Sequence, residues 1–120
     1  MGRLTGRLTD RRILDLIIEA LENGSRGCIG YVIWKQRGWE WIATNLQSQT
    51  QRSIADTLLS HVLSGAKIDQ VREKREGHED DAQFHYDFRI RIDDTDLYVE
   101  TVLDETKTGP VLRIVNVHLK

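Results

Sequence analysis

The last third of the chain alternates between apolar and polar residues with a period of two, which is the pattern of a half-buried β-strand. In the run FHYDFRIRI (84–92), the aromatic and aliphatic residues fall on one face. The polar residues on the other face are His85, Asp87, Arg89 and Arg91. The segment DDTD (93–96) has turn chemistry and leads into the run LYVETVL (97–103), so these residues predict an antiparallel hairpin.

The pairing of these runs decides which polar side chains meet. If Ile92 lies opposite Leu97, then Arg91 faces Tyr98, Arg89 faces Glu100 and Asp87 faces Val102. The run VLRIVNVHL (111–119) follows a turn at 108–110 and pairs with the second strand. In the simplest register it adds Leu112, Ile114, Asn116 and His118 to the polar-bearing face, with His118 beside Tyr98 and Arg91. A slip of one residue would replace that set by Arg113, Val115 and Val117.

Two amphipathic helices are predicted before this sheet. The first spans about 10–23, with Asp10 or Thr9 as the N-cap and Asn23-Gly24 as the stop. The second spans about 49–64, begins at a segment resembling a capping box, Ser48-x-x-Gln51, and ends at Gly65. A short strand is expected at 68–72, whereas the basic amino-terminal arm is expected to be frayed.

The aromatic segment between the helices predicts a second hairpin. Residues 28–34 are rich in β-branched and aromatic side chains, and 36–38 carry turn chemistry before Trp39 and Trp41. Such a hairpin can stack a ligand on its tryptophans, although core packing is the more common use of so much apolar area. Cys28 is expected to be a small core residue of the first strand.

Taken together, these elements predict a single α+β domain over residues 1–120. Its antiparallel sheet has about five strands, with two helices packed on one face. A chain of 120 residues can bury one core without disulfides or metals. Neither an apolar run of about 20 residues nor a signal-peptide pattern is present, so a cytoplasmic location without membrane contact is expected.

Charge is distributed unevenly, although the net charge is only −2. Residues 1–75 are net positive and residues 76–120 net negative, so attraction to nucleic acid requires a local basic patch. The acidic segment that contains His78, Glu79, Asp80 and Asp81 and precedes His85 has ligand-type residues. Its spacing matches no established metal site and is more typical of a solvated charge run, so neither a metal nor a cofactor is expected.

The polar face carries the candidate chemistry. Arg can hold a phosphate and stabilise its developing charge, and His can move a proton near neutral pH. We therefore expect Arg91, Tyr98 and His118 as catalytic residues of a phosphodiester-cleaving site. The expected ligand-binding residues are Arg89, Glu100, Asn116, Trp39 and Trp41. The alternative is an ordinary exposed sheet face, where Arg89 and Glu100 form only a structural charge pair.

The order of a helix (RSIADTLLSHVLSGAKI), a polar link and a strand meander ending in RIVNVHL resembles the RNase-toxin superfamily that includes barnase, EndoU, colicin and RelE-type nucleases. The resemblance covers residues 52–119. It implies metal-independent cleavage of RNA by side chains on the sheet face. On this chain, that role passes to Arg91, Tyr98 and His118.

Three functions therefore remain open. The first is a metal-independent endoribonuclease of toxin type, with RNA as its partner. The second is a non-enzymatic module that binds a small molecule or a protein in a groove between the aromatic hairpin and the sheet face. The third is an acidic antitoxin-like or immunity-like protein that meets a basic partner. A homo-oligomer is compatible with each of these functions.

Overall fold

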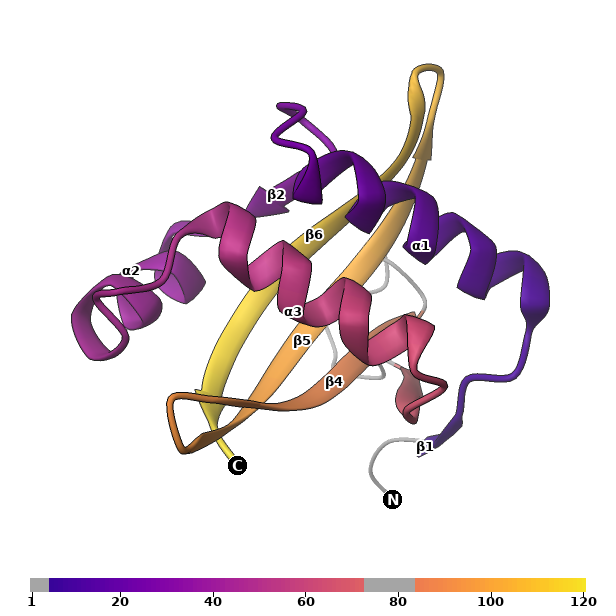
Figure 1. Ribbon diagram of the computed structural model, residues 1–120. Helices are drawn as coiled ribbons and strands as arrows, with labels where there is room; N and C mark the ends of the chain where they lie inside the picture. The colour runs from indigo at the N-terminus through magenta and orange to yellow at the C-terminus, as the bar shows by residue number, and fades with distance from the viewer. Residues whose placement is uncertain (1–4, 73–83) are drawn as a thin grey trace, which may run out of the picture.

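One six-stranded mixed sheet and three helices occupy residues 5–72 and 84–120, the part of the chain that the computed structural model describes. The elements run in the order β1 (Thr5–Arg7), α1 (Arg11–Ser25), β2 (Val32–Trp34), α2 (Gln36–Asn45), α3 (Gln51–Leu63), β3 (Ile68–Arg72), β4 (Phe84–Ile92), β5 (Thr95–Thr106) and β6 (Gly109–Leu119). The strand order is β1-β3-β4-β5-β6-β2. Helices α1 and α3 cover one face of the sheet (Figure 1). The fold is therefore α+β, as predicted.

Helices α1 and α3 begin at side-chain caps. Asp10 accepts hydrogen bonds from the backbone of Arg12 and Ile13, which confirms it as the N-cap of α1. Helix α3 has a capping box formed by Thr50 and Ser53, two residues later than the predicted Ser48-x-x-Gln51. Both predicted helices are thus present, with ends displaced by one or two residues.

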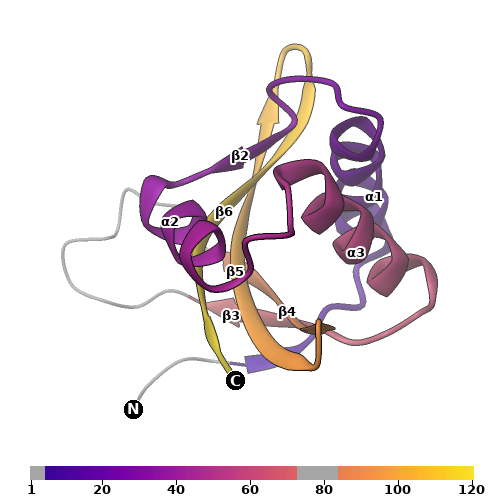
Figure 2. The ribbon, with the colours of Figure 1, turned by 60° about the vertical axis from the view of Figure 1, so that its left-hand side comes forward.

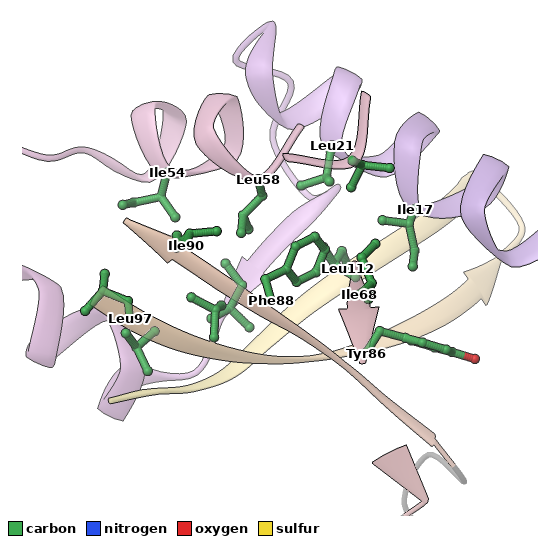
Figure 3. Close-up of a cluster of buried hydrophobic side chains, with 14 of the residues drawn as sticks. Ile17, Leu21, Ile54, Leu58, Ile68, Tyr86, Phe88, Ile90, Leu97 and Leu112 are labelled. Carbon is green, nitrogen blue, oxygen red and sulfur yellow. The ribbon is translucent and has the colours of Figure 1, made fainter. Parts of the chain in front are cut away.

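The core lies between these helices and the sheet. Phe88 of β4 is fully buried, and its ring meets that of His61 edge-on at a centroid distance of 5.5 Å. Figure 3 shows Phe88 below α3 and beside α1, among aliphatic side chains from both layers. The labelled aliphatic residues of this cluster are Ile17, Leu21, Ile54, Leu58, Ile68, Ile90, Leu97 and Leu112. The apolar face of the β4–β5 hairpin therefore points to the helices, as its alternation predicts.

The predicted aromatic hairpin is wrong, because the second half of that segment is a helix. Helix α2 contains Trp39 and Trp41, and its buried residues include Ile42, while Leu46 is buried just after it. The spacing of Trp39, Ile42 and Leu46 follows a helix better than a strand. Only the first half forms a strand, β2, and Cys28 lies exposed in the loop before it. Figure 2 shows α2 beside β6 at the edge of the sheet.

The sheet is mixed rather than antiparallel because β2 runs parallel to β6. Strand β1 adds a further antiparallel edge beside β3, where a frayed arm was expected. The prediction therefore missed one strand and one helix and assigned β2 to the wrong partner. Helix α2 packs closely against β6, since a Cβ on Gly38 would be 3.9 Å from the backbone nitrogen of Asn116. The helix therefore shields part of the β6 edge.

The turn between β4 and β5 is tighter than predicted. Its two residues, Asp93 and Asp94, have φ angles of 50° and 62°, as a type I′ turn requires. Ile92 consequently pairs with Thr95 rather than Leu97. The shift is two residues, so each side chain keeps its predicted face while its partner across the strands changes.

Strands β5 and β6 contain an irregularity that reconciles the two registers considered above. Glu100 pairs with Asn116, but Thr101 pairs with Ile114, so Val115 is an extra residue in β6. Residues 112 and 114 consequently face the helices, whereas residues 116 and 118 face the opposite side. After Val115, the first register considered is correct, because Asn116 and His118 lie on the polar side. Before Val115, the register shifted by one residue is correct, because Arg113 lies on that side.

The type I′ turn predicts opposite effects for two substitutions at Asp94. Asp94→Gly should raise the free energy of unfolding by about 0.5–1 kcal/mol, because glycine accepts a positive φ without strain. Asp94→Val should lower it by about 1–2 kcal/mol, because a β-branched side chain is strained there. Urea unfolding measures both values, with native protein as the reference. Equal effects of Gly and Val would contradict the turn geometry.

Candidate functional site

The face of the sheet opposite α1 and α3 gathers the polar residues of the four strands β3 to β6. We call it the polar face. Its central side chains are Asp69, Asp87, Arg89, Tyr98, Glu100, Asn116 and His118. Each of them is next in sequence to a core residue of its own strand, and successive side chains of a strand point to opposite faces. Two rows cross the strands on this face.

The first row, which we call the acidic row, consists of Asp69, Asp87 and Glu100. Asp69 of β3 pairs with Asp87 of β4, which in turn pairs with Glu100 of β5. All three are buried, with relative exposures of 2%, 0% and 8%. Three neighbouring carboxylates in such a position require partners, because like charges directly opposite one another are destabilising.

The second row, which we call the donor row, consists of Arg89, Tyr98 and His118. Tyr98 pairs across the strands with Arg89 on one side and His118 on the other. The rings of Tyr98 and His118 are stacked, with centroids 5.1 Å apart. The guanidinium carbon of Arg89 lies 5.8 Å from the centroid of the Tyr98 ring. Tyr98 is therefore a platform between two basic side chains.

Each residue of the donor row contacts the acidic-row carboxylate of the preceding strand in the sheet. Arg89 Nε donates to Asp69 Oδ2 at 3.1 Å, and Tyr98 Oη donates to Asp87 Oδ2 at 2.7 Å. His118 Nε2 lies 3.3 Å from Glu100 Oε2, which also accepts a hydrogen bond from Asn116 Nδ2 at 3.0 Å. These three contacts, which we call the diagonal pairs, run in the same direction across the sheet. They connect all four strands.

The diagonal pairs place negative charge inside and donors outside. The side chains of Arg89 and His118 are 51% and 48% exposed, whereas their carboxylate partners are buried. The three carboxylates of the acidic row are thus buried, and each is paired with a basic or hydroxyl group. A ligand approaching the polar face meets the donor row first.

Tyr98 is held in its protonated form. Burial raises the pKa of its hydroxyl well above the usual value, and the hydrogen bond to Asp87 raises it further. Tyr98 consequently remains a hydrogen-bond donor at neutral pH, and Asp87 is its acceptor. This arrangement suits Tyr98 to orienting its neighbours rather than to exchanging a proton.

His118 and Glu100 are the pair suited to proton transfer. Nε2 of His118 faces the Glu100 carboxylate, and Nδ1 lies 3.1 Å from the carbonyl oxygen of Leu119. A protonated imidazole can therefore donate to both acceptors. Such an imidazole and a carboxylate can act as a general acid and a general base.

Metal chemistry has no identified location among the described residues. No group of three or more His, Cys, Asp or Glu side chains there is arranged to hold a metal ion. Of the acidic segment considered as a metal site, His78 to Asp81 lie outside the described residues, and His85 is a buried residue of β4.

The structure brings together only part of the predicted catalytic set. Tyr98 and His118 are neighbours, but Arg91 lies in the next row, where it pairs with Asp96 at 3.0 Å and Asp94 at 3.7 Å. The tight turn causes this change, because it moves every β5 partner of β4 by two residues. Arg89 takes the place beside Tyr98 that was predicted for Arg91.

The predicted ligand-binding residues divide in the same way. Glu100 and Asn116 lie beside His118, and Arg89 contacts Asp69 rather than Glu100. Trp39 and Trp41 belong to α2, where Trp39 meets Trp34 edge-on at 5.2 Å. Both are half-buried against the core, so they do not line the polar face.

Two residues of the site were missed. Asp69 and Asp87 were both placed in strands, but their burial depends on neighbours across the sheet. A carboxylate flanked by core residues, as in IDQV and YDFR, was the available signal. That signal could not show which side chain each carboxylate would meet.

Comparisons with models of protein families, with curated proteins and with solved structures find no match for this chain. The described helices include none that is long and apolar enough to cross a membrane.

Removing the hydroxyl of Tyr98 tests the central diagonal pair. Tyr98→Phe should lower the free energy of unfolding by about 1–3 kcal/mol, because buried Asp87 loses a donor. Tyr31→Phe is the matched control, since the Tyr31 hydroxyl makes an exposed bond of 3.3 Å to Thr108, and it should cost under about 0.5 kcal/mol. Similar losses in urea unfolding would contradict the assigned geometry.

The raised pKa of Tyr98 also predicts a pH dependence. The folded chain keeps this proton at pH values where the unfolded chain loses it, so the free energy of unfolding should fall as the pH rises above about 10. The Tyr98→Phe protein should lack the part of this decrease in the free energy of unfolding that comes from Tyr98. Unfolding measured from pH 8 to about 11 tests the difference between the two proteins, and parallel curves would oppose it.

Proposed function

We propose that this protein is a metal-independent endoribonuclease of toxin type, with its site on the polar face. The observation that carries the proposal is the pairing of a half-exposed imidazole with a buried carboxylate, His118 with Glu100, beside Tyr98 and Arg89. RNA supplies its own nucleophile in the 2′-hydroxyl group. Such a reaction needs proton transfer and phosphate binding, which these residue types can perform.

The proposed reaction is a transfer of the phosphoryl group to the 2′-oxygen. Glu100 accepts the proton of the 2′-hydroxyl as this oxygen attacks the adjacent phosphorus. The bond from phosphorus to the 5′-oxygen breaks, and protonated His118 gives its proton to that leaving oxygen. The products are a 2′,3′-cyclic phosphate and a 5′-hydroxyl. No oxidant, reductant or cofactor enters the balance.

The contact between His118 and Glu100 gives a route for resetting the site. After the transfer, Glu100 holds the proton that His118 lacks. Their atoms are 3.3 Å apart, so that proton can pass directly back to the imidazole once the product leaves. In-line displacement places the attacking and leaving oxygens on opposite sides of phosphorus. The bound phosphate must therefore separate the pair, and His118 is the solvent-exposed partner that has room to turn away.

Arg89 supplies positive charge in the same row. Its guanidinium is held by Asp69 and Tyr98, which reduces the entropy lost when it binds a phosphate. This arrangement supports Arg89, instead of Arg91, as the arginine that attracts the RNA backbone. Tyr98 is a positioning residue in this proposal, because its hydroxyl is bonded to Asp87.

The other two functions have less support. The aromatic binding module required a tryptophan hairpin, whereas Trp39 and Trp41 lie on α2. The antitoxin-like or immunity-like function required an exposed acidic patch at 79–87 and 93–96. Residues 79–83 lie outside the described part of the chain and Asp87 is buried, whereas Asp94 and Asp96 are exposed but paired with Arg91.

Cleavage of labelled single-stranded and structured RNA in EDTA tests the proposal. Relative to native protein, His118→Ala should lose about 10²- to 10⁴-fold in rate, as expected for loss of a general acid. Glu100→Gln should be similarly impaired, since it keeps the shape but cannot accept the proton. Arg91→Ala is the matched control and should keep most of the activity, because Arg91 is engaged outside the donor row.

Each variant must first show a native circular dichroism spectrum and a cooperative unfolding transition. Cleavage that is absent from native protein, or that persists unchanged in folded His118→Ala, would overturn the proposal. The same purification applied to all four proteins excludes a contaminating nuclease, since its activity would not follow the substitution.

A further inference from the structure

Lys67 and Arg89 share one buried carboxylate. Lys67 Nζ lies 3.3 Å from Asp69 Oδ1, and Arg89 Nε lies 3.1 Å from Asp69 Oδ2. The two cations are 57% and 51% exposed, whereas Asp69 is 2% exposed. Two exposed positive charges thus surround a single buried negative charge. Together the three side chains have a net positive charge of one, and the two cations face solvent.

Arg89 is positioned to accept a further anion. It uses Nε for the bond to Asp69, and neither Nη atom forms a hydrogen bond to the residues that the structure describes. The two Nη groups are the donors that an arginine can direct to a phosphate in a bidentate manner. Lys67 adds a point charge beside them.

The register places these cations in line with the proposed catalytic residue. Ile68 pairs with Phe88, so Lys67, one residue earlier, lies beside Arg89, one residue later. Arg89 is opposite Tyr98, which is opposite His118. The row from Lys67 to His118 therefore crosses β3, β4, β5 and β6, a span of about 14 Å at the usual distance between strands.

The neighbouring rows restrict what can lie along this row. On one side is the acidic row of Asp69, Asp87 and Glu100, and on the other Arg91 is paired with Asp94 and Asp96. One phosphate backbone can follow the cations. The second backbone of a duplex would have to lie over the acidic row or over Arg91, which is already paired with two carboxylates, so it would gain no comparable attraction.

We infer that Lys67 and Arg89 form a second phosphate subsite, separate from the phosphate at His118, and that the substrate is single-stranded RNA lying across strands β3 to β6. Arg89 and His118 are two strands apart, about 10 Å, so they contact different phosphates of one strand. This inference rests on the proposed function, since it defines the substrate of the same site. A dinucleotide with a single phosphate would occupy only the part at His118.

Binding to a non-cleavable ligand tests the subsite independently of catalysis. The probe is a fluorescent single-stranded oligonucleotide of six residues that lacks 2′-hydroxyl groups, and the measurement is its dissociation constant at several salt concentrations. Lys67→Gln and Arg89→Gln should each weaken binding about tenfold, as expected for loss of a charge-assisted contact. Each should also reduce the slope of log affinity against log salt by about 0.7, the value for one phosphate of a single strand.

Two exposed residues provide matched controls for the change in charge. Lys107→Gln removes a lysine at the β5–β6 turn, at the far end of that hairpin from His118, and Arg26→Gln removes an exposed arginine after α1. Both should bind the oligonucleotide as native protein does. A duplex of the same length should compete poorly. Equal weakening by test and control variants, or equal affinity for the duplex, would overturn the inference.

Cleavage then separates this inference from the proposed function. If native protein cleaves RNA, Lys67→Gln should slow cleavage of the hexamer and leave the dinucleotide unaffected, whereas His118→Ala should abolish both. Equal slowing of the two substrates by Lys67→Gln would contradict a separate subsite. If native protein cleaves neither, the nuclease proposal fails, and Lys67-dependent binding of the oligonucleotide would still support the subsite.

Discussion

One extra residue in β6 determines what both faces of the sheet present. Without the irregularity at Val115, a strand with strict alternation would send Ile114 and His118 to the same side. With it, Leu112 and Ile114 enter the core, and Asn116 and His118 reach the polar face. In the first half of β6, the even-numbered residues must point into the core. In the second half, the even-numbered residues must point to the polar face. A bulge satisfies both requirements in one continuous strand.

The polar face then resolves an apparent conflict in the charges. The last part of the chain is net negative, which argues against binding a phosphate. In space, the carboxylates of Asp69, Asp87 and Glu100 are buried, and each contacts a donor-row side chain. A buried charge is costly unless it is paired, so these contacts offset the desolvation of the acidic row. They also orient the Arg89 and His118 side chains that face solvent.

Sequence patterns predicted well the features that depend on local periodicity. The helices beginning near Asp10 and Thr50 and the apolar faces of β4 and β5 follow from spacings that burial enforces. Prediction failed in residues 35–46, because two tryptophans raised the apparent strand propensity of a segment whose buried positions have helical spacing. Strands β1 and β2 were missed or misassigned because three residues carry almost no periodic signal, and their pairing depends on distant partners.

The candidate site was harder to predict for a related reason. Its residue types and their common face follow from alternation, and the neighbouring positions of Tyr98 and His118 were foreseen. The partners of Arg89, Arg91 and Glu100 depended on the length of one turn, since Asp93 and Asp94 can belong to a loop of two residues or of four. The extra residue in β6 has no local signature in the run RIVNV. Both features are set by packing across the sheet.

The diagonal pairs have a consequence for how the chain selects one fold among close competitors. A shift of β5 against β4 by two residues leaves Phe88, Ile90, Leu97 and Val99 on the helix side, so hydrophobic burial distinguishes poorly between the two arrangements. The polar contacts do distinguish them, because a shifted strand would bring Asp87 beside Val102 and leave buried carboxylates with other neighbours. The polar residues of this face thus favour one register of the strands, in addition to supplying the donors of the candidate site.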